Sequence, residues 1–188
     1  VAVLRSEALT LNADLVAVLS AHTLQLLAQI DNNAEHVRQC DQAIAKLLGA
    51  LSTTTDETPS DAAILSSLPG VGAVVLATVL GEASTAIAAR DLPRMRAITG
   101  CAPVSVLSGK RQNRYHSRSA PNVQMRHACS DRLRDAAYHM ARIASVFSEP
   151  HKARYQAMRS RGHTHGRACR QLADQMLTTA FAMLRDRT

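Results

Sequence analysis

Apolar residues recur every three or four positions over the first fifty residues, and this spacing predicts a long amphipathic helix. The apolar stripe falls into two sets: Leu4, Ala8, Leu11, Leu15 and Val18, then Ile30, Val37, Cys40, Ile44, Leu47 and Leu51. Its register slips between His22 and Ile30, as at a stutter, and Asn33 falls on the seam, where a polar residue can fix register. We expect a coiled coil that dimerises or packs along a neighbour. The alternative is an ordinary amphipathic helix of a bundle.

A threonine-rich stretch, 52–60, predicts a linker, and a hairpin motif follows it. The sequence LSSLPGVGAVVLATVL (65–80) predicts a short helix, a tight turn and a second helix. Gly70 and Gly72 permit positive φ and a close approach of the backbone. The pattern is similar to a helix-hairpin-helix element, whose free amides hold phosphate without reading sequence. Both glycines are therefore candidate nucleic-acid contacts, and the alternative is a packing corner with no ligand.

Helical patterns dominate the rest of the chain. We expect helices over 92–99, from Pro121 to about Val146, from the break at 148–150 to about Arg161, and from Arg167 to Leu184, with 101–119 irregular or briefly extended. The expected inward positions are Cys129, Leu133, Ala136, Ala137, Met140 and Ile143, then Leu172, Met176, Leu177, Ala180 and Leu184. The prediction is an all-α fold with a helix (1–51), a linker (52–60) and a helical domain (61–188).

Composition agrees with this fold class. Hydrophobic residues make up 46% of the chain, whereas aromatic residues make up 3% and tryptophan is absent, so the core must consist of aliphatic side chains that suit packed helices. The four cysteines are far apart, which argues against a zinc site or a disulfide framework and favours a reducing cytosol. We expect no membrane span and no signal peptide, and the chain, which begins at Val1, is expected to be a fragment.

Positive charge is concentrated in one part of the chain. The net charge is +7, but residues 90–170 hold 17 Lys and Arg against 4 Asp and Glu. Nearly all of these cations are arginines, whose planar fork matches phosphate geometry. The block therefore predicts a nucleic-acid surface.

A serine lies within this basic block, in the stretch APVSVLSGK (102–110). Ser108 is followed by a glycine and then by Lys110, Arg111, Arg114, His116 and Arg118. A hydroxyl among guanidinium groups suits attack on a phosphodiester, with the cations stabilising the developing charge. Ser105 is the rival nucleophile, and His116 is close in sequence without being an evident base. The alternative is a polar loop whose arginines only hold nucleic acid.

Other titratable clusters carry weaker predictions. Asp131 and Asp135 lie one helical turn apart, but Arg132 and Arg134 flank them and favour a salt-bridged surface over a metal site. A second set, His151, His163 and His165, has no partner carboxylate for a metal. We therefore predict no metal site within this chain.

Three motifs come in a familiar order: LPGVG (68–72), APV (102–104) and SGK (108–110), followed by an arginine-rich helix and a helical hairpin with Arg154, Tyr155 and Arg161. Over roughly 65–184 the chain resembles the C-terminal transposase domain of the IS110 (IS116/IS902) insertion-sequence transposases, related to Piv-like DNA invertases. It departs from the family's usual Lys/Arg-Gly-Asn-Pro-like run, where it has RSAPN (118–122).

The resemblance implies a mechanism and partners. Ser108 corresponds to the family's covalent nucleophile, and a RuvC-like domain outside this chain would bind divalent metal, Mg²⁺, through four acidic residues. The implied partners are DNA, a structured bridge RNA and further copies of the protein, in the bacterial cytoplasm at the nucleoid.

We therefore expect a serine recombinase domain in which Lys110, Arg111 and Arg114 hold the phosphate and Arg118 and Arg126 add nucleic-acid contacts. By itself the fragment should bind nucleic acid but be inactive. Two rivals are a non-enzymatic helix-hairpin-helix module and a dimerisation module built on residues 1–50.

Overall fold

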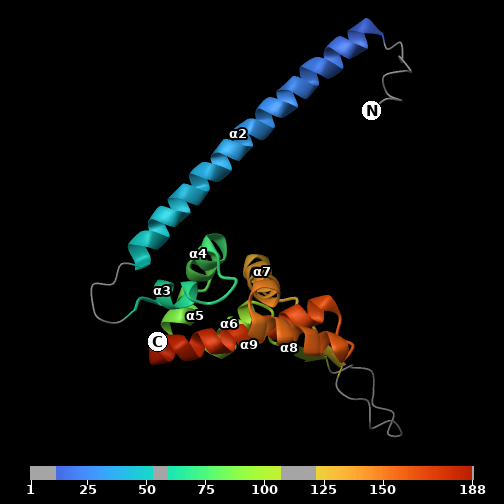
Figure 1. Ribbon diagram of the computed structural model, residues 1–188. Coiled ribbons are helices and arrows are strands. Elements are labelled where there is room, and N and C mark those ends of the chain that lie inside the picture. The colour runs from blue at the N-terminus through green and yellow to red at the C-terminus, as the bar shows by residue number, and fades with distance from the viewer. Residues whose placement is uncertain (1–11, 53–58, 107–121, 188) are drawn as a thin grey trace. The chain divides into compact units, whose positions relative to one another are not determined.

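The computed structural model describes residues 12–52, 59–106 and 122–187. The elements are α2 (Ala13–Ser52), α3 (Asp61–Ser66), α4 (Ala73–Glu82), α5 (Ser84–Ala88), α6 (Leu92–Ile98), β1 (Val104–Val106), β2 (Asn122–Gln124), α7 (Asp131–Phe147), α8 (Glu149–Ser160) and α9 (His165–Asp186). The all-α prediction is confirmed, as the arrangement of helices shows (Figure 1). One short antiparallel pair of strands is inserted between α6 and α7. The chain divides into two compact units, Val1–Ala43 and Ile44–Thr188. The sequence-based domain limits stay predictions.

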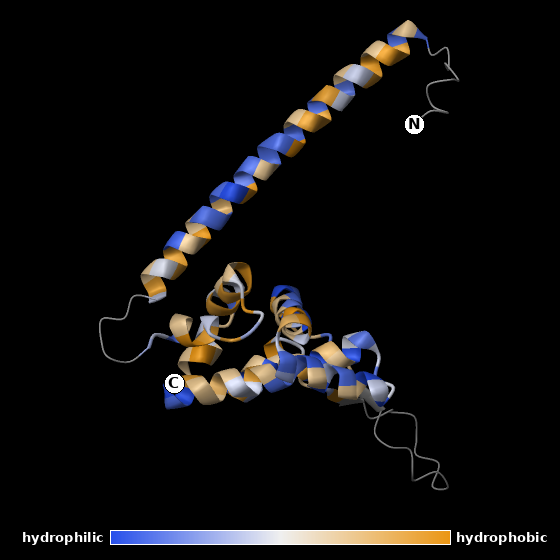
Figure 2. Ribbon diagram, viewed as in Figure 1, coloured by the Kyte–Doolittle hydropathy of each residue, from blue (hydrophilic) through white to orange (hydrophobic). Residues whose placement is uncertain are grey.

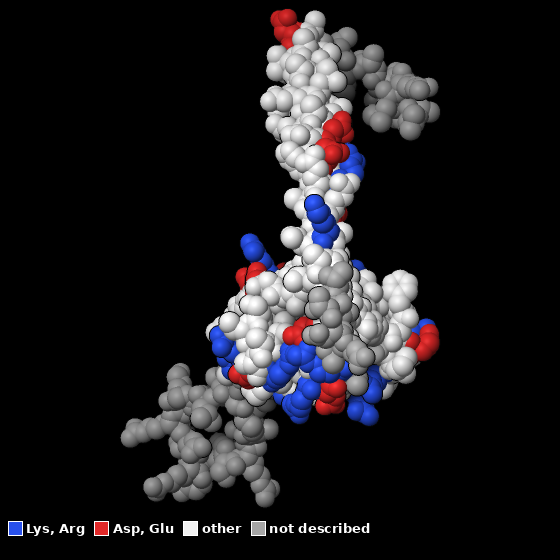
Figure 3. All heavy atoms as spheres, turned by 90° about the vertical axis from the view of Figure 1, so that its left-hand side faces the viewer, with Lys and Arg blue, Asp and Glu red and all other residues white. Residues whose placement is uncertain are grey.

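Helix α2 confirms the long N-terminal helix within the described residues. None of its residues is buried, and leucines such as Leu24 and Leu27 are 67% and 51% exposed. Apolar and polar positions are mixed along its length (Figure 2), and few charged side chains project from it (Figure 3). By length and composition alone α2 is apolar enough to cross a membrane, and the expectation of no membrane span stays a prediction. Length and composition do not separate a membrane span from an apolar docking helix.

The core of the second unit is built around α9. This helix begins after Thr164, whose side chain accepts a hydrogen bond from the amide of Arg167, and it buries nine residues. All five of its predicted inward positions are among them: Leu172, Met176, Leu177, Ala180 and Leu184. It packs against α3, α6, α7 and α8, so one amphipathic helix organises most of the unit.

Helix α7 starts later than its sequence pattern predicts. The prediction began the helix at Pro121, but residues 122–124 form β2 and the helix starts at Asp131. Ser130 caps it by accepting a hydrogen bond from the amide of Leu133 at 3.3 Å. Cys129 therefore precedes the helix and is only partly buried, so its predicted place on the inward stripe is wrong.

The inward face of α7 is also made of smaller residues than predicted. Ile143 is 36% exposed, whereas Ala141 and Ala144 are fully buried. The reason is the turn between α3 and α4, where a Cβ on Gly70 would lie 3.1 Å from the amide nitrogen of Ala144. Small side chains let the two backbones approach.

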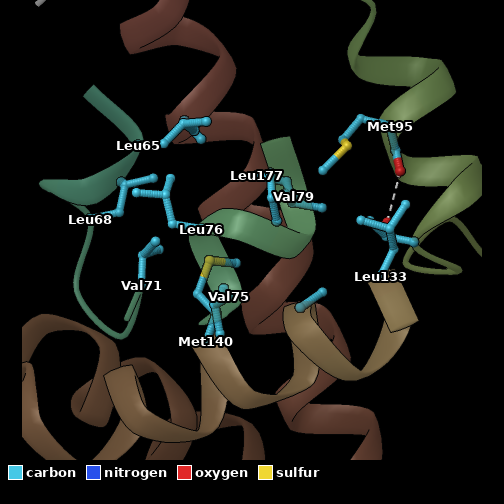
Figure 4. Close-up of a pocket in the computed structure, with 13 residues that line it drawn as sticks. Leu65, Leu68, Val71, Val75, Leu76, Val79, Met95, Leu133, Met140 and Leu177 are labelled. Carbon is cyan, nitrogen blue, oxygen red and sulfur yellow. Dashed lines mark hydrogen bonds between the residues drawn. The ribbon is translucent and has the colours of Figure 1, made fainter. Parts of the chain in front are cut away.

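The centre of the unit is apolar and nearly filled. Side chains from α3, α4, α6, α7 and α9 converge on a void of about 20 Å³ (Figure 4). Leu65, Leu76, Met95, Leu133 and Met140 are among those that line it, and each is at most 5% exposed. A void of this size leaves the packed side chains little room for rearrangement.

Candidate nucleic-acid interface

The segment with the predicted nucleophile is bracketed by the antiparallel pair β1–β2, called the ribbon below. Its register pairs Val104 with Gln124 and Val106 with Asn122. Residues 107–121 connect the two strands and lie outside the described residues, and so do Ser108, Lys110, Arg111, Arg114, His116 and Arg118. The rival serine, Ser105, pairs with Val123 in the middle of the ribbon. The roles assigned to these residues stay predictions.

The ribbon is fastened to the core at its start. The amide of Ala102 donates to the carbonyl of Arg96 at 3.0 Å, and Cys101 is buried beside this contact. Arg96 in turn forms a two-pronged ion pair with Asp174 of α9, in which Nη2 and Oδ2 are 2.6 Å apart. Burial raises the pKa of the Cys101 thiol, which keeps this side chain in its neutral form. The base of the ribbon is therefore held by α6 and α9.

The turn between α3 and α4 has the predicted helix–turn–helix form, but its two glycines differ. Gly70 has φ +83°, and a Cβ there would lie 2.3 Å from the carbonyl oxygen of Met140 in α7. Gly72 precedes α4 and has open space where a Cβ would be. Gly70 therefore serves the packing of the turn against α7, whereas the exposed start of α4 at Gly72 remains available for a ligand. The nucleic-acid role of both glycines stays a prediction.

Arg126, predicted as a nucleic-acid contact, lies two residues beyond β2 at the edge of a concave surface. This concavity, called the hollow below, has a volume of about 520 Å³. Its polar lining comes from Glu82, Thr85, Arg94, Arg126 and Ser130. The hollow thus gathers residues from four separate segments of the chain around one predicted contact.

Ion pairs occupy the acidic residues at the start of α7. Asp131 lies 2.9 Å and Asp135 4.0 Å from Arg134, so the salt-bridged interpretation of this cluster is confirmed. Arg132 is exposed and reaches Glu82 of α4 at 3.3 Å. Among the described residues, no group of three His, Cys, Asp or Glu side chains could hold a metal ion.

His165 of the C-terminal hairpin belongs to a hydrogen-bonded cluster that sequence reasoning missed. His165 Nδ1 lies 2.8 Å from the hydroxyl of Tyr155, and its Nε2 lies 3.0 Å from the hydroxyl of Tyr138. His151 instead faces Ser148 at 2.8 Å, and burial together with Arg154 lowers the pKa of its imidazole. The one sequence signal was the short turn at 161–164, which returns α9 alongside α8. The cluster ties α7, α8 and α9 together.

Comparison with known sequences decides the family. The Transposase IS116/IS110/IS902 family matches residues 62–156, just over half of the chain. The chain belongs to this family. Its match encloses the α3–α4 turn, the ribbon with the segment 107–121, and α7, so the transposase pattern and the candidate interface coincide. Helices α2 and α9 lie beyond it.

Two curated relatives agree with this assignment. The chain is 31% identical over 133 residues to the insertion element IS116 uncharacterized 44.8 kDa protein of Streptomyces clavuligerus, covering 71% of this chain and 31% of the relative. It is also 31% identical over 129 residues to the insertion element IS110 uncharacterized 43.6 kDa protein of Streptomyces coelicolor, covering 66% of this chain and 29% of the relative. The chain thus spans about a third of the length of each IS110-family relative it matches.

Proposed function

We propose that this chain is part of a transposase that cuts and rejoins DNA, and that it supplies the DNA-binding surface and the nucleophilic serine. The observation that carries the proposal is the family match over 62–156, which encloses the SGK motif of Ser108. Family membership supports DNA as the partner. The basic block, with 17 Lys and Arg against 4 Asp and Glu over residues 90–170, supports it independently.

In the proposed reaction the Oγ atom of Ser108 attacks a backbone phosphorus. A P–Oγ bond forms, the bond between phosphorus and one strand end breaks, and the proton of the serine hydroxyl passes through a base or solvent to the leaving oxygen, which departs as a hydroxyl. A hydroxyl of the partner strand then attacks the phosphoserine and restores the serine, so the number of phosphodiester bonds is conserved. Lys110, Arg111 and Arg114 would take up the negative charge that develops on the phosphate oxygens.

The remaining components of the proposal come from the resemblance. Mg²⁺ would be held by a RuvC-like domain outside this chain and would polarise the phosphate. A bridge RNA would guide the choice of target, and the protein would act in the bacterial cytoplasm at the nucleoid. A homo-oligomer has separate support in α2, because an exposed apolar stripe of this length needs a partner surface.

The test replaces Ser108 by alanine in the full-length transposase. We expect recombination to fall by about a thousandfold or more while DNA affinity stays within about twofold, because only the nucleophile is removed. Ser105→Ala is the matched control and should keep recombination near the parent level. Unchanged recombination in Ser108→Ala would favour the non-enzymatic helix-hairpin-helix module, and loss only in Ser105→Ala would move the nucleophile to that position.

A further inference from the structure

The hollow is a built site, because its walls are fixed by the main chain. The amide of Ser130 donates to the carbonyl of Ile98 at 2.9 Å, which joins the segment after β2 to the end of α6. At the same contact a Cβ on Gly100, which has φ +69°, would lie 2.9 Å from the Sγ atom of Cys129 and 3.3 Å from the carbonyl oxygen of Arg126. Only glycine allows this approach. The backbone of Arg126 is therefore held in place whether or not a ligand is bound.

The guanidinium group of Arg126 contains an unpaired hydrogen-bond donor. Its Nε atom is buried and has no hydrogen-bond partner among the described residues. A buried donor of this kind that stays unpaired costs about 1–3 kcal/mol. Arg126 also lines the hollow, so its guanidinium group can meet an acceptor placed there.

The charges of the hollow favour an anion. Arg94 lines it from α6, is exposed, and forms no ion pair with a described residue. Glu82 contributes the only carboxylate among the described residues that line the hollow, and it accepts a hydrogen bond from the hydroxyl of Ser130 at 2.6 Å and pairs with Arg132 at 3.3 Å. Arg94 and Arg126, which form no ion pair with a described residue, thus line the hollow together with a carboxylate that Arg132 already pairs. The hydroxyl of Thr85 adds one further donor at the wall.

We propose that the hollow holds a phosphodiester group of a nucleic-acid backbone, gripped by Arg94 and Arg126. This inference rests on the proposed function, which supplies the nucleic acid. A volume of about 520 Å³ exceeds what a free phosphate needs and leaves room for the sugars on either side. Arginine forks match the paired oxygens of a phosphodiester. Because Arg126 follows β2 closely, the strand held here would pass beside the ribbon that brackets residues 107–121.

Arg94→Ala and Arg126→Ala in the 188-residue chain test this proposal. Affinity for a short DNA duplex and for an RNA duplex of equal length is measured by fluorescence anisotropy over a salt series. Each variant should lose about tenfold in affinity for at least one duplex, and its log–log salt slope should become shallower by about one. Arg126→Lys should keep the slope of the parent and still bind more weakly, because lysine has the charge without the Nε–H fork. The duplex that responds identifies the source of the phosphodiester.

Arg185→Ala is the matched control. Arg185 is an exposed arginine near the end of α9, has no ion pair with a described residue, and does not line the hollow. If the parent binds both duplexes but all the arginine variants weaken binding equally, the hollow is overturned and the proposed function survives. A parent chain that binds neither duplex overturns both. Thermal unfolding of each variant excludes a folding defect, and since Arg94 is exposed, its variant keeps the test valid if Arg126→Ala unfolds.

Discussion

Helices α2 and α9 are both long and both carry an apolar stripe, yet they have opposite environments. Helix α9 buries nine of its 22 residues, whereas α2 buries none of its 40. The same kind of periodicity therefore predicts a helix in both places and says nothing of what covers its apolar face. In α9 the neighbour is the rest of the same unit. In α2 apolar side chains such as Leu24, Ile30 and Val37 are exposed, and Leu48 near its C-terminal end packs against the core.

Because of this difference, apolar residues of α9 contribute to the stability of the fold, whereas those of α2 contribute to association with a partner. A leucine that is fully removed from water stabilises its fold by about 1.5–3 kcal/mol, and Leu172 of α9 is in that position at 0% exposure. Leu24 of α2 is 67% exposed, so it contributes such a stabilisation only when a partner covers it. The leucines of α9 should therefore determine stability, and those of α2 should determine association.

The largest expected effect comes from Leu172→Ala. Removing this side chain should lower the free energy of unfolding by about 3 kcal/mol, because a buried leucine leaves both a lost transfer term and a cavity. Urea denaturation followed by circular dichroism measures the change. The void between α4 and α7 measures only about 20 Å³, so the core is already well packed. We therefore expect the core not to collapse onto the new cavity.

Leu24→Ala is the matched control for that measurement, with the same chemical change on an exposed helix. We expect its effect on unfolding of the second unit to stay within about 0.5 kcal/mol. A loss as large as that of Leu172→Ala would show that α2 is part of the same core, and the distinction between the two helices would fail.

All five inward positions predicted for α9 are buried, although four further residues of that helix are buried as well, and the inner face of α7 was predicted in part. The α9 stripe is made of leucine and methionine at regular spacing, which is the strongest signal that periodicity can give. In α7 the buried positions Ala141 and Ala144 carry no hydrophobic signal, because alanine is as common on exposed faces. Their burial depends on the close contact with Gly70, which comes from a segment about seventy residues earlier. Such a contact is invisible to local patterns.

Gly70→Ala gives the next largest effect and tests that contact. The substitution puts a Cβ 2.3 Å from the Met140 carbonyl oxygen at a residue with φ +83°. We expect a loss of about 2 kcal/mol, because strain at positive φ adds to the steric clash. Thermal unfolding is a sufficient measurement.

Gly72→Ala is the control two residues away, where a Cβ meets open space and φ is −84°. We expect little change in stability there. Equal effects at the two glycines would contradict the packing role assigned to Gly70. If Gly72→Ala weakens DNA binding without any loss of stability, the predicted phosphate contact at the start of α4 gains support.

The candidate site was less accessible to sequence reasoning than the core. A serine next to a glycine and several arginines is a pattern of residue types, and its meaning depends on where the chain brings them together. A hydrogen-bonded cluster brings together side chains from three helices, Tyr138, Tyr155 and His165, and their spacing in the sequence does not predict it. Glu82 and Ser130 are likewise 48 residues apart and share the wall of the hollow. The ribbon is a further example, because it pairs residues 104–106 with residues 122–124, and the periodicity of either segment does not predict that pairing.

The smallest expected effect compares one ion pair from each unit. Arg90 and Asp61 are 22% and 30% exposed, whereas Arg38 and Glu35 on α2 are 66% and 48% exposed. Asp61→Asn should lower the free energy of unfolding at neutral pH by about 1 kcal/mol or less, since the pair is only partly shielded from solvent. Glu35→Gln should leave unfolding of the second unit unchanged. Urea denaturation at neutral pH measures both.

The pH dependence sharpens the same comparison. Hydrogen bonds from Arg90 lower the pKa of Asp61 in the folded chain, so the folded state binds this proton less readily than the unfolded state does. The stabilisation is therefore fully present above the unfolded pKa of about 4 and is lost as the pH falls through the lower folded value. Asp61→Asn should remove this part of the acid sensitivity, so the gap between variant and parent narrows below about pH 4. If the difference in free energy of unfolding between variant and parent stays constant down to strong acid, Asp61 acts through packing and not through its charge. The ion pairs would then give no ground for distinguishing the two units.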